Sequence, residues 1–413
     1  MVSIIFVNSG NSVDIEKIRK DFPILENTNI IYMDSACMSL RPVQVIESME
    51  DYYRNFPACI GRSSHKLGNK ASLEFEKARE RVKNYLGAKN AKEIIFTRNS
   101  TEGINLIART LRFGEGDTVI TTDREHNSNL LPWQELIKRR GIVHKVVPSN
   151  EEEKFDLETL KEIISKTDKV KLVSVVHTSN LDGYTLPVGD IIKISHEHGA
   201  LVLIDGAQSA GHKPVNLKEL DPDFFVMSSH KACGPSGMGC LYVRESILEK
   251  LEPFLVGGGT VYNSWYDKAN YEELPLRFEA GLQNIAGAIG FGVACEYIEN
   301  IGRENIKKHE ENLNKILTEG TEDIEGLEIV GLRDYRERSG IFNFNLEGIN
   351  SHEVALLLDN IKNITVRSGM HCLHSWFNSR GINGSVRASV YFYNNEEETE
   401  ILVESLKGIA RLR

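Results

Sequence analysis

Short apolar runs alternate with helix-length amphipathic stretches through the middle of the chain. Six of these runs have the length of strands and are apolar throughout: residues 93–96, 118–121, 170–176, 200–204, 223–227 and 240–243. Uniformly apolar runs are typical of strands buried on both faces, and strands that alternate with helices form mainly parallel sheets. The pattern therefore predicts an α/β domain with helices on both sides of its sheet.

The pattern changes after about residue 286. A long helical pattern extends from there towards residue 316 and is interpreted as a linker helix. Beyond it come alternating runs typical of half-exposed strands, separated by helical stretches, at residues 341–346, 351–358, 364–367, 386–393 and 396–409. This order predicts a smaller α+β domain in the C-terminal part of the chain.

Length and composition fit this division. The chain has 413 residues, of which 41% are hydrophobic and 26% charged, as in globular proteins of two or three domains. We expect a large domain at residues 31–290. Residues 1–30 and 291–413 are expected to form the small one.

Charge, apolar run length and cysteine spacing argue against a nucleic-acid partner, a membrane segment and a disulfide scaffold. A net charge of -10 argues against nucleic acid, whose partners concentrate Lys and Arg. The N-terminal apolar run 4–7 is too short for a signal-peptide core, and no run reaches membrane-spanning length. Six scattered cysteines lack the spacing of a disulfide scaffold, so we expect reduced thiols, at least one of which can serve as a nucleophile. These features predict a cytoplasmic protein without a membrane or nucleic-acid partner.

Polar side chains follow five of the predicted strands. Ligands of open α/β sheets bind at the carboxyl ends of the strands, so these side chains are expected to converge there. Each cluster taken alone also fits turn or helix-cap chemistry. The clusters contain Asn99, Ser100, Thr101, His126, Asn180, Asp205, Gln208 and residues 228–231.

Lys231 follows one of these strands and precedes the glycine-rich segment 234–239. Glycine allows the backbone to pass close to a ligand. A lone lysine in this place is usually a solvated surface charge, but Asp205 ends a neighbouring buried run. A carboxylate there is suited to keep a pyridinium nitrogen protonated, as pyridoxal phosphate (PLP) requires. Alternatively, the Asp205 side chain caps the amino end of a helix.

The spacing of Asp205, Gln208 and Lys231, with Ser228 and His230 before the lysine, resembles the class V aminotransferase family of fold-type I PLP enzymes. The resemblance extends over nearly the whole chain, from the motif at 32–36 to that at 385–389. It implies a large domain with a mainly parallel seven-stranded sheet covered by helices, plus the smaller α+β domain.

The resemblance also implies the roles of the cofactor residues. Lys231 would carry PLP as a Schiff base, Asp205 would pair with the ring nitrogen, and His126 would stack on the ring. Gln208 would contact the ring hydroxyl. Asn180 would contact either the ring hydroxyl or the substrate. The phosphate would lie among Ser100, Thr101, Ser228 and His230.

Within that family, the run 367–372 is similar to that of the cysteine desulfurases, a group also called selenocysteine lyase-like. The resemblance implies an enzyme that converts L-cysteine to L-alanine and leaves the sulfur as a persulfide on Cys372, for an acceptor or scaffold protein of iron–sulfur cluster assembly. Arg387 would hold the substrate carboxylate in a two-point fork, and His65 would lie near the substrate. Selenocysteine lyase, C-S lyase, aminotransferase and a non-catalytic assembly partner remain alternatives.

Other features of the chain leave further alternatives open. Cys372 is expected in a mobile loop, which suits delivery of sulfur to an acceptor. Cys233 lies close to Lys231 but is interpreted as a small packed residue. His371, Cys372 and His374 lack a clear fourth ligand, so no metal site is predicted. The family resemblance implies a homodimer, with residues 257–271 facing the partner subunit.

Overall fold

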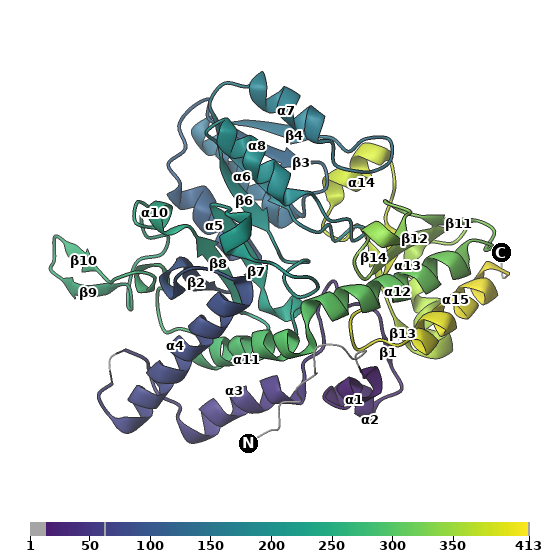
Figure 1. The fold of residues 1–413 in the computed structure, drawn as a ribbon, viewed down its shortest axis with the longest axis horizontal. Helices are drawn as coiled ribbons and strands as arrows, with labels where there is room; N and C mark the ends of the chain where they lie inside the picture. The colour runs from purple at the N-terminus through teal and green to yellow at the C-terminus, as the bar shows by residue number, and fades with distance from the viewer. Residues whose placement is uncertain (1–13, 62, 412–413) are drawn as a thin grey trace.

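A seven-stranded sheet is the main feature of the computed structural model, which describes residues 14–61 and 63–411 (Figure 1). The strand order is β2-β8-β7-β6-β5-β3-β4. β8 is antiparallel to both of its neighbours, and the other adjacent strands run parallel. The strands are β2 (Ile94–Thr97), β3 (Thr118–Thr122), β4 (Val143–Val147), β5 (Val170–Val176), β6 (Leu201–Asp205), β7 (Phe224–Ser228) and β8 (Gly239–Val243). The predicted fold class is confirmed.

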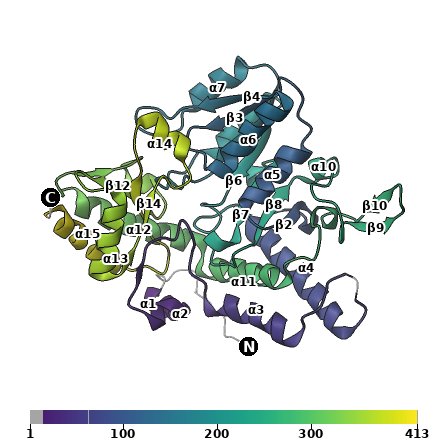
Figure 2. The ribbon, with the colours of Figure 1, turned by 180° about the vertical axis from the view of Figure 1, so that it is seen from behind.

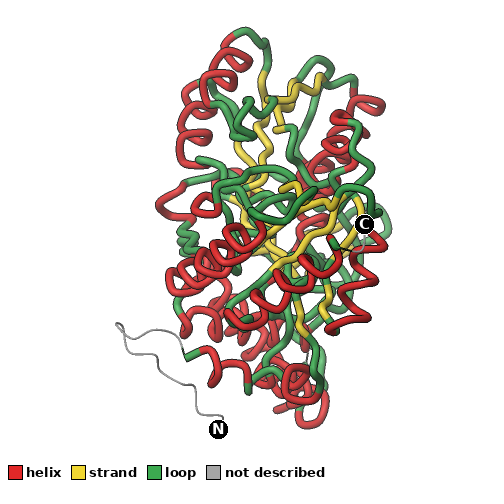
Figure 3. The backbone as a smooth tube through the Cα atoms, turned by 90° about the vertical axis from the view of Figure 1, so that its right-hand side faces the viewer, coloured by secondary structure: helices red, strands yellow, loops and turns green. Residues whose placement is uncertain are grey.

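The central strands are buried on both faces because their successive side chains enter two separate apolar cores. Phe224 and Val226 of β7 pack in one core, whereas Phe225 and Met227 pack in the other. This alternation follows from the two-residue period of a strand. Helices lie on both sides of the strands (Figure 3), as the uniformly apolar runs predict.

Helices connect and cover these strands. They are α3 (Val43–Asn55), α4 (Lys66–Leu86), α5 (Ser100–Thr110), α6 (Asn127–Arg140), α7 (Leu157–Ser165), α8 (Val188–Glu197), α9 (Leu217–Leu220), α10 (Glu245–Leu248) and α11 (Ile285–Ile301), with 3₁₀ turns η1 (Ala91–Glu93), η2 (Ser229–Lys231) and η3 (Leu276–Phe278). Among the helices of the described residues, none is long and apolar enough to cross a membrane.

A second, antiparallel sheet has the strand order β11-β12-β15-β14. Its strands are β11 (Leu327–Ile329), β12 (Ile341–Leu346), β14 (Arg367–Gly369) and β15 (Ser385–Ser389). Around it lie α12 (Arg303–Thr321), η4 (Tyr335–Glu337), α13 (Ser351–Lys362), α14 (His374–Arg380) and α15 (Glu396–Ala410) (Figure 2). A separate apolar core, which includes Phe342 and Leu406, forms between this sheet and its helices.

The N-terminal segment packs against this second part. After α1 (Ile15–Arg19) and α2 (Pro23–Asn27), strand β1 (Ile31–Tyr32) pairs in parallel with β13 (Ile364–Thr365). Residues 31–32 lie in the predicted large domain, yet their strand partner belongs to the predicted small one. The division at residues 30 and 290 stays a prediction, and residues 1–13, with the apolar run 4–7, lie outside the described residues.

A β-hairpin projects from the large sheet. It consists of β9 (Val261–Ser264) and β10 (Ala269–Tyr271), and both views of the ribbon show it extending away from the body of the molecule (Figures 1 and 2). Trp265 and Tyr266 at its tip are exposed.

The structure corrects two sequence predictions. The helical pattern from residue 286 forms two helices rather than one, because Gly302 adopts φ +88° and ends α11 before α12 begins. Strand β4 has no predicted counterpart. It is an edge strand whose residues His144 and Lys145 interrupt the apolar run, so it lacks the pattern of a strand buried on both faces.

Candidate active site

Three of the predicted polar clusters and parts of the other two meet in one cavity of about 330 Å³ at the carboxyl ends of the large-sheet strands. The second sheet closes the cavity from the other side with residues of β14, β15 and the turn after β14. The lining consists of Ala36, Cys37, Asn99, Ser100, Thr101, His126, Ser128, Asn180, Asp205, Ala207, Ser228, His230, Lys231, Arg367, Ser368, His371, Cys372 and Arg387.

Lys231 and Asp205 enter this cavity from adjacent parallel strands. Asp205 is the last residue of β6, and Lys231 ends the 3₁₀ turn that follows β7. Burial lowers the pKa of the Lys231 amine and raises the pKa of the Asp205 carboxyl, and the attraction between the two groups opposes both shifts. The cavity thus holds a buried carboxylate and a half-buried amine near each other.

The amino end of α5 forms a second wall, rich in hydroxyl groups. Ser228 Oγ accepts a hydrogen bond from the Ser100 amide at 2.9 Å and lies 2.8 Å from Ser100 Oγ. Thr101 Oγ1 and Ser128 Oγ are 2.7 Å apart. A helix amino end with several hydroxyl groups favours an anion such as a phosphate.

Histidines 126 and 230 lie beside the lysine as neutral rings. Burial, with added repulsion from Lys231 and Arg387, lowers the pKa of His126 to about 3. Burial and Lys231 also lower the pKa of His230 to about 4. At neutral pH the His126 imidazole is uncharged, so its face is suited to pack against an aromatic ring.

These donors fit pyridoxal phosphate. The carboxylate of Asp205 suits the ring nitrogen, the Lys231 amine suits the aldehyde carbon, and the hydroxyl groups at the start of α5 suit the phosphate. The three groups line one cavity, as a cofactor with three functional ends requires.

Two predicted site residues lie outside the cavity lining. Gln208 is buried and its Nε2 donates a hydrogen bond to the Ala36 carbonyl oxygen at 2.6 Å, directly behind the cavity wall. His65 is exposed and caps α4, where its Nδ1 accepts a hydrogen bond from the Gly68 amide at 3.2 Å. The resemblance places both by sequence position, and this chain does not bring either side chain into the cavity.

Two arginines from adjacent strands of the second sheet line the cavity. Arg367 makes a two-point contact with the carboxylate of Asp34, with the shortest distance 2.8 Å from Nη2. Arg387 is 2% exposed, and its Nε has no hydrogen-bond partner among the described residues. Burial lowers the pKa of Arg387 to about 10. The fork of Arg367 is therefore occupied by Asp34. Arg387 Nη2 lies 3.8 Å from the same carboxylate, but Arg387 Nε keeps a donor without a partner in the described part of the chain.

Cys372 lies in a tight turn at the entrance of the cavity, and its side chain is exposed. His371 and Cys372 have φ values of +49° and +61°. The backbone is held by hydrogen bonds from the Asn127 amide to the Cys372 carbonyl oxygen and from Asn180 Nδ2 to the His371 carbonyl oxygen, both at 2.8 Å.

The segment after this turn corrects the expectation of one long mobile loop. Helix α14 begins at His374, and its Trp376 and Phe377 pack in a small apolar core with Leu181. Arg380 at the end of the helix pairs with Asp123, which follows β3. Sequence periodicity missed α14 because it has only seven residues. The Cys372 turn is thus anchored on both sides.

The neighbouring histidines point to separate partners. His371 Nε2 lies 3.0 Å from Ser385 Oγ, and burial lowers the pKa of His371 to about 2. His374 Nδ1 lies 2.9 Å from Asn127 Nδ2. Within residues 14–61 and 63–411, no group of three or more His, Cys, Asp or Glu side chains is placed to hold a metal ion.

Sequence reasoning gave no role to several lining residues. Arg367 lines the cavity, and Asp34, which binds it, lies behind the wall; the motifs that carried the resemblance contain both residues and were the available signal for them. Cys37 and Ser128 had no signal beyond residue type, since only the fold brings them to the cavity. Cys233 does not line it, and burial raises the pKa of the Cys233 thiol, which agrees with a packed residue.

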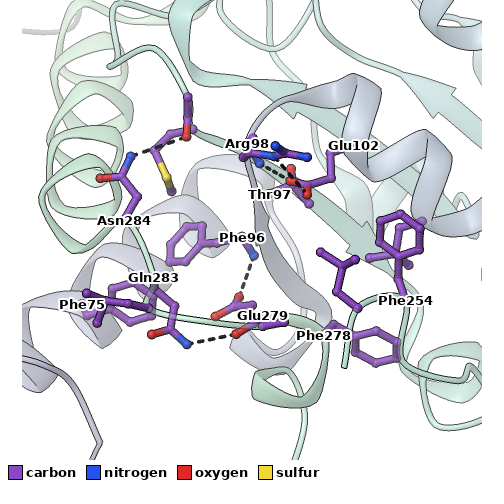
Figure 4. Close-up of a pocket in the computed structure, with 16 residues that line it drawn as sticks. Phe75, Phe96, Thr97, Arg98, Glu102, Phe254, Phe278, Glu279, Gln283 and Asn284 are labelled. Atoms are coloured by element: carbon purple, nitrogen blue, oxygen red, sulfur yellow. Dashed lines mark hydrogen bonds and ion pairs between the residues drawn. The ribbon is translucent and has the colours of Figure 1, made fainter. Parts of the chain in front are cut away.

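A second cavity, of about 490 Å³, contains none of the predicted site residues. Its walls include Phe75, Phe96 and Phe278, and the Phe96 amide donates a hydrogen bond to Glu279 Oε1 at 2.7 Å (Figure 4). Leu282 at its rim is 74% exposed.

Comparison with known proteins identifies the family. The family model described as aminotransferase class-V matches residues 31–402. The chain belongs to the class V aminotransferase family. This membership confirms the predicted enzyme class and its pyridoxal phosphate cofactor.

Relatives of this class V chain are named as cysteine desulfurases or probable cysteine desulfurases. A cysteine desulfurase of Haloferax volcanii is 35% identical, covering 98% of this chain and 99% of that protein. A probable cysteine desulfurase of Halalkalibacterium halodurans is 38% identical, covering 95% and 97%.

Solved structures agree in fold. The apo cysteine desulfurase of Thermococcus onnurineus NA1 has a TM-score of 0.92 and 38% identity over 100% of both chains. The S-sulfonic acid form of the Escherichia coli cysteine desulfurase CsdA has a TM-score of 0.90 and 29% identity, covering 97% of this chain and 100% of that one.

Proposed function

We propose that this class V enzyme is a cysteine desulfurase that converts L-cysteine to L-alanine and retains the sulfur as a persulfide on Cys372. One observation carries the proposal: the Cys372 thiol lines the same cavity as Lys231 and Arg387. Relatives named cysteine desulfurase, similar over nearly their whole length, support it.

The chain's own residues divide the work of binding the cofactor. Lys231 would hold it through Nζ, and Asp205 would keep its ring nitrogen protonated. His126 would lie against the ring, while Ser100, Thr101, Ser228 and His230 would surround the phosphate. Pyridoxal phosphate, when bound, acidifies the α-proton of an amino acid by withdrawing electrons from the α-carbon. The contact of Gln208 with the ring hydroxyl stays a prediction, because its Nε2 donates a hydrogen bond to the Ala36 carbonyl oxygen behind the cavity wall.

Substrate binding is assigned to Arg387, with Asn180 beside it. Arg387, whose buried Nε has no hydrogen-bond partner among the described residues, would bind the cysteine carboxylate as a charge-assisted pair. The Lys231 amine, whose pKa burial lowers, would then take the α-proton. His65 stays a weaker prediction for a residue near the substrate.

The sulfur step belongs to Cys372. A thiolate there would attack the sulfur of the bound cysteine, and Lys231 and Arg387 lie within electrostatic range of it. The thiolate is the nucleophilic form of cysteine. The exposed position of the side chain suits transfer of the persulfide sulfur to an acceptor protein, which we propose serves iron–sulfur cluster assembly in the cytoplasm.

We also propose that the chain works as a homodimer. The exposed aromatic side chains of the β9–β10 hairpin and the exposed Leu282 at the second cavity offer apolar surface that a second copy would cover. Gel filtration at several concentrations tests this, and a monomer throughout the range would contradict it.

Anaerobic incubation with L-cysteine tests the reaction. Alanine together with a persulfide on Cys372 is the expected result, and Cys372→Ser should keep the yellow cofactor absorbance but form no persulfide. Pyruvate and ammonia would instead indicate a C-S lyase, and dependence on a keto acid an aminotransferase. A faster reaction with selenocysteine, without Cys372, would indicate a selenocysteine lyase. No reaction in any of these assays would indicate a non-catalytic assembly partner.

A further inference from the structure

The active-site cavity contains a second cysteine, Cys37. The six cysteines of the chain fall into three groups. Cys233, Cys240 and Cys295 are buried, and Cys59 is exposed on a part of the surface that does not line the cavity. Cys37 and Cys372 line it from opposite ends of the sequence.

The backbone around Cys37 is fixed by hydrogen bonds on both sides. The Cys37 amide donates to the Asp34 carbonyl oxygen at 3.0 Å, which closes a turn. The preceding Ala36 amide donates to Ser389 Oγ at 2.9 Å, and the Ala36 carbonyl oxygen accepts from Gln208. The half-buried thiol is therefore held at the cavity wall.

The two cysteines share the same cationic surroundings. Lys231 and Arg387 each lie within electrostatic range of both Cys37 and Cys372, and Arg367 is within range of Cys37 as well. Arg387 is buried and has an Nε without a partner among the described residues. An anionic sulfur formed on either cysteine is stabilised by the same charges, so the cavity can hold it at either place.

We propose that Cys37 is a second sulfur-accepting thiol, which takes the outer sulfur atom from the persulfide on Cys372. The proposal rests on the proposed desulfurase function, because Cys372 must be loaded first. Cys37 would then store one sulfur atom inside the cavity while Cys372 becomes free for another turnover.

The transfer is balanced without an added oxidant or reductant. The Cys37 thiolate attacks the outer sulfur of the Cys372 persulfide, and a new S–S bond forms on Cys37. The S–S bond on Cys372 breaks, and its electron pair leaves with the Cys372 thiolate. The transferred sulfur keeps its proton, and the number of persulfides is unchanged.

The test is a rapid-quench experiment on the PLP-loaded enzyme with L-cysteine, under anaerobic conditions and without an acceptor protein. The burst of alanine should reach about two per subunit in the wild type, since both thiols fill, and about one in Cys37→Ser. Cys59→Ser is the matched control, because it removes a cysteine outside the cavity, and its burst should equal that of the wild type.

Peptide mapping of the unmodified wild type supplies a readout that needs no variant. Trypsin releases Cys37 in residues 21–54, because it does not cut before Pro42, and Cys372 in residues 368–380. After alkylation of persulfides, both peptides should carry the additional sulfur, with the Cys372 peptide labelled first.

Three results would overturn the proposal in distinguishable ways. A persulfide confined to Cys372 in the wild type, with a burst of about one, rejects the role of Cys37 and leaves the desulfurase function intact. A Cys37–Cys372 disulfide with released hydrosulfide shows attack on the inner sulfur, so Cys37 would not carry sulfur. No persulfide on any cysteine rejects the desulfurase function itself.

Discussion

Arg387 Nη1 donates a hydrogen bond to the backbone carbonyl oxygen of Asn180, and the two atoms are 2.9 Å apart. The contact joins β15 of the second sheet to the segment after β5 of the large sheet. It holds the guanidinium in the cavity before any substrate arrives, so little side-chain entropy is lost when a carboxylate binds. The active site thus depends on how the two sheets meet.

The two cavity arginines are expected to differ in their effect on substrate binding. Arg387→Lys keeps the charge but removes the planar fork, so kcat/KM for L-cysteine should fall about 10- to 100-fold, mainly through KM. Steady-state alanine formation measures this. Arg367→Lys is the control, and it should have the smaller effect because Asp34 already occupies that guanidinium. The reverse order would assign the substrate carboxylate to Arg367.

Asp205 is expected to control the rate rather than the binding of cofactor. Asp205→Asn removes the charge that keeps the ring nitrogen protonated, so kcat should fall about 10²- to 10³-fold. The cofactor should still bind, which its absorbance would report. Asp190→Asn, at an exposed position, should leave kcat unchanged. A wild-type rate in the Asp205 variant would contradict its assigned role.

His177 is expected to weaken the fold in acid. Burial lowers the pKa of His177 to about 3, against a reference value of about 6.5 in the unfolded chain. Between these pH values the unfolded state binds one more proton at His177 than the folded state does. The contribution of His177 to the free energy of unfolding is therefore fully present above pH 6.5 and is lost as the pH falls towards 3.

Replacement of this histidine should flatten the acid limb of the stability curve. His177→Gln removes a contribution of at most about 1.4 kcal/mol for each pH unit below 6.5. Urea unfolding of the apoenzyme between pH 7 and 5 measures the slope. His198→Asn, at an exposed position, should leave the slope unchanged. An equal slope in the wild type and the His177 variant would show that His177 does not drive acid unfolding.

A buried ion pair is expected to stabilise the region of the second cavity. Arg79 contacts both carboxylate oxygens of Glu279, at 2.6 and 3.0 Å, and both side chains are almost completely buried. Glu279→Gln would leave the buried guanidinium with only the exposed Glu76 carboxylate, 3.3 Å from Arg79 Nε, as its counter-charge, and the free energy of unfolding should fall by about 3–5 kcal/mol.

The control for this change is the exposed pair of Arg54 and Glu50. Glu50→Gln should cost no more than about 0.5 kcal/mol, because water screens the charges. Denaturant unfolding of the two variants at equal concentration compares them. Equal losses would mean that the buried pair contributes no more than a surface pair.

Six of the seven strands of the large sheet and much of the cavity were predictable from the amino-acid sequence. Buried strands require uniformly apolar runs, and parallel connections bring the residues after those runs to one edge, so Ser100, His126, Asp205 and Lys231 were predictable from local pattern. The motifs of the class V family added roles for Arg387 and Cys372.

Tertiary structure alone decided the remaining features. Which arginine has a free donor depends on Asp34, some 330 positions away in sequence from Arg367, and the half-exposed strand β4 has no two-sided apolar signal. Cys37 and Cys372 line one cavity only because β1 pairs with β13 and Asp34 bridges Ser389 of β15, which brings distant parts of the chain together. Local periodicity records which face of an element is buried, but not which distant side chain lies opposite.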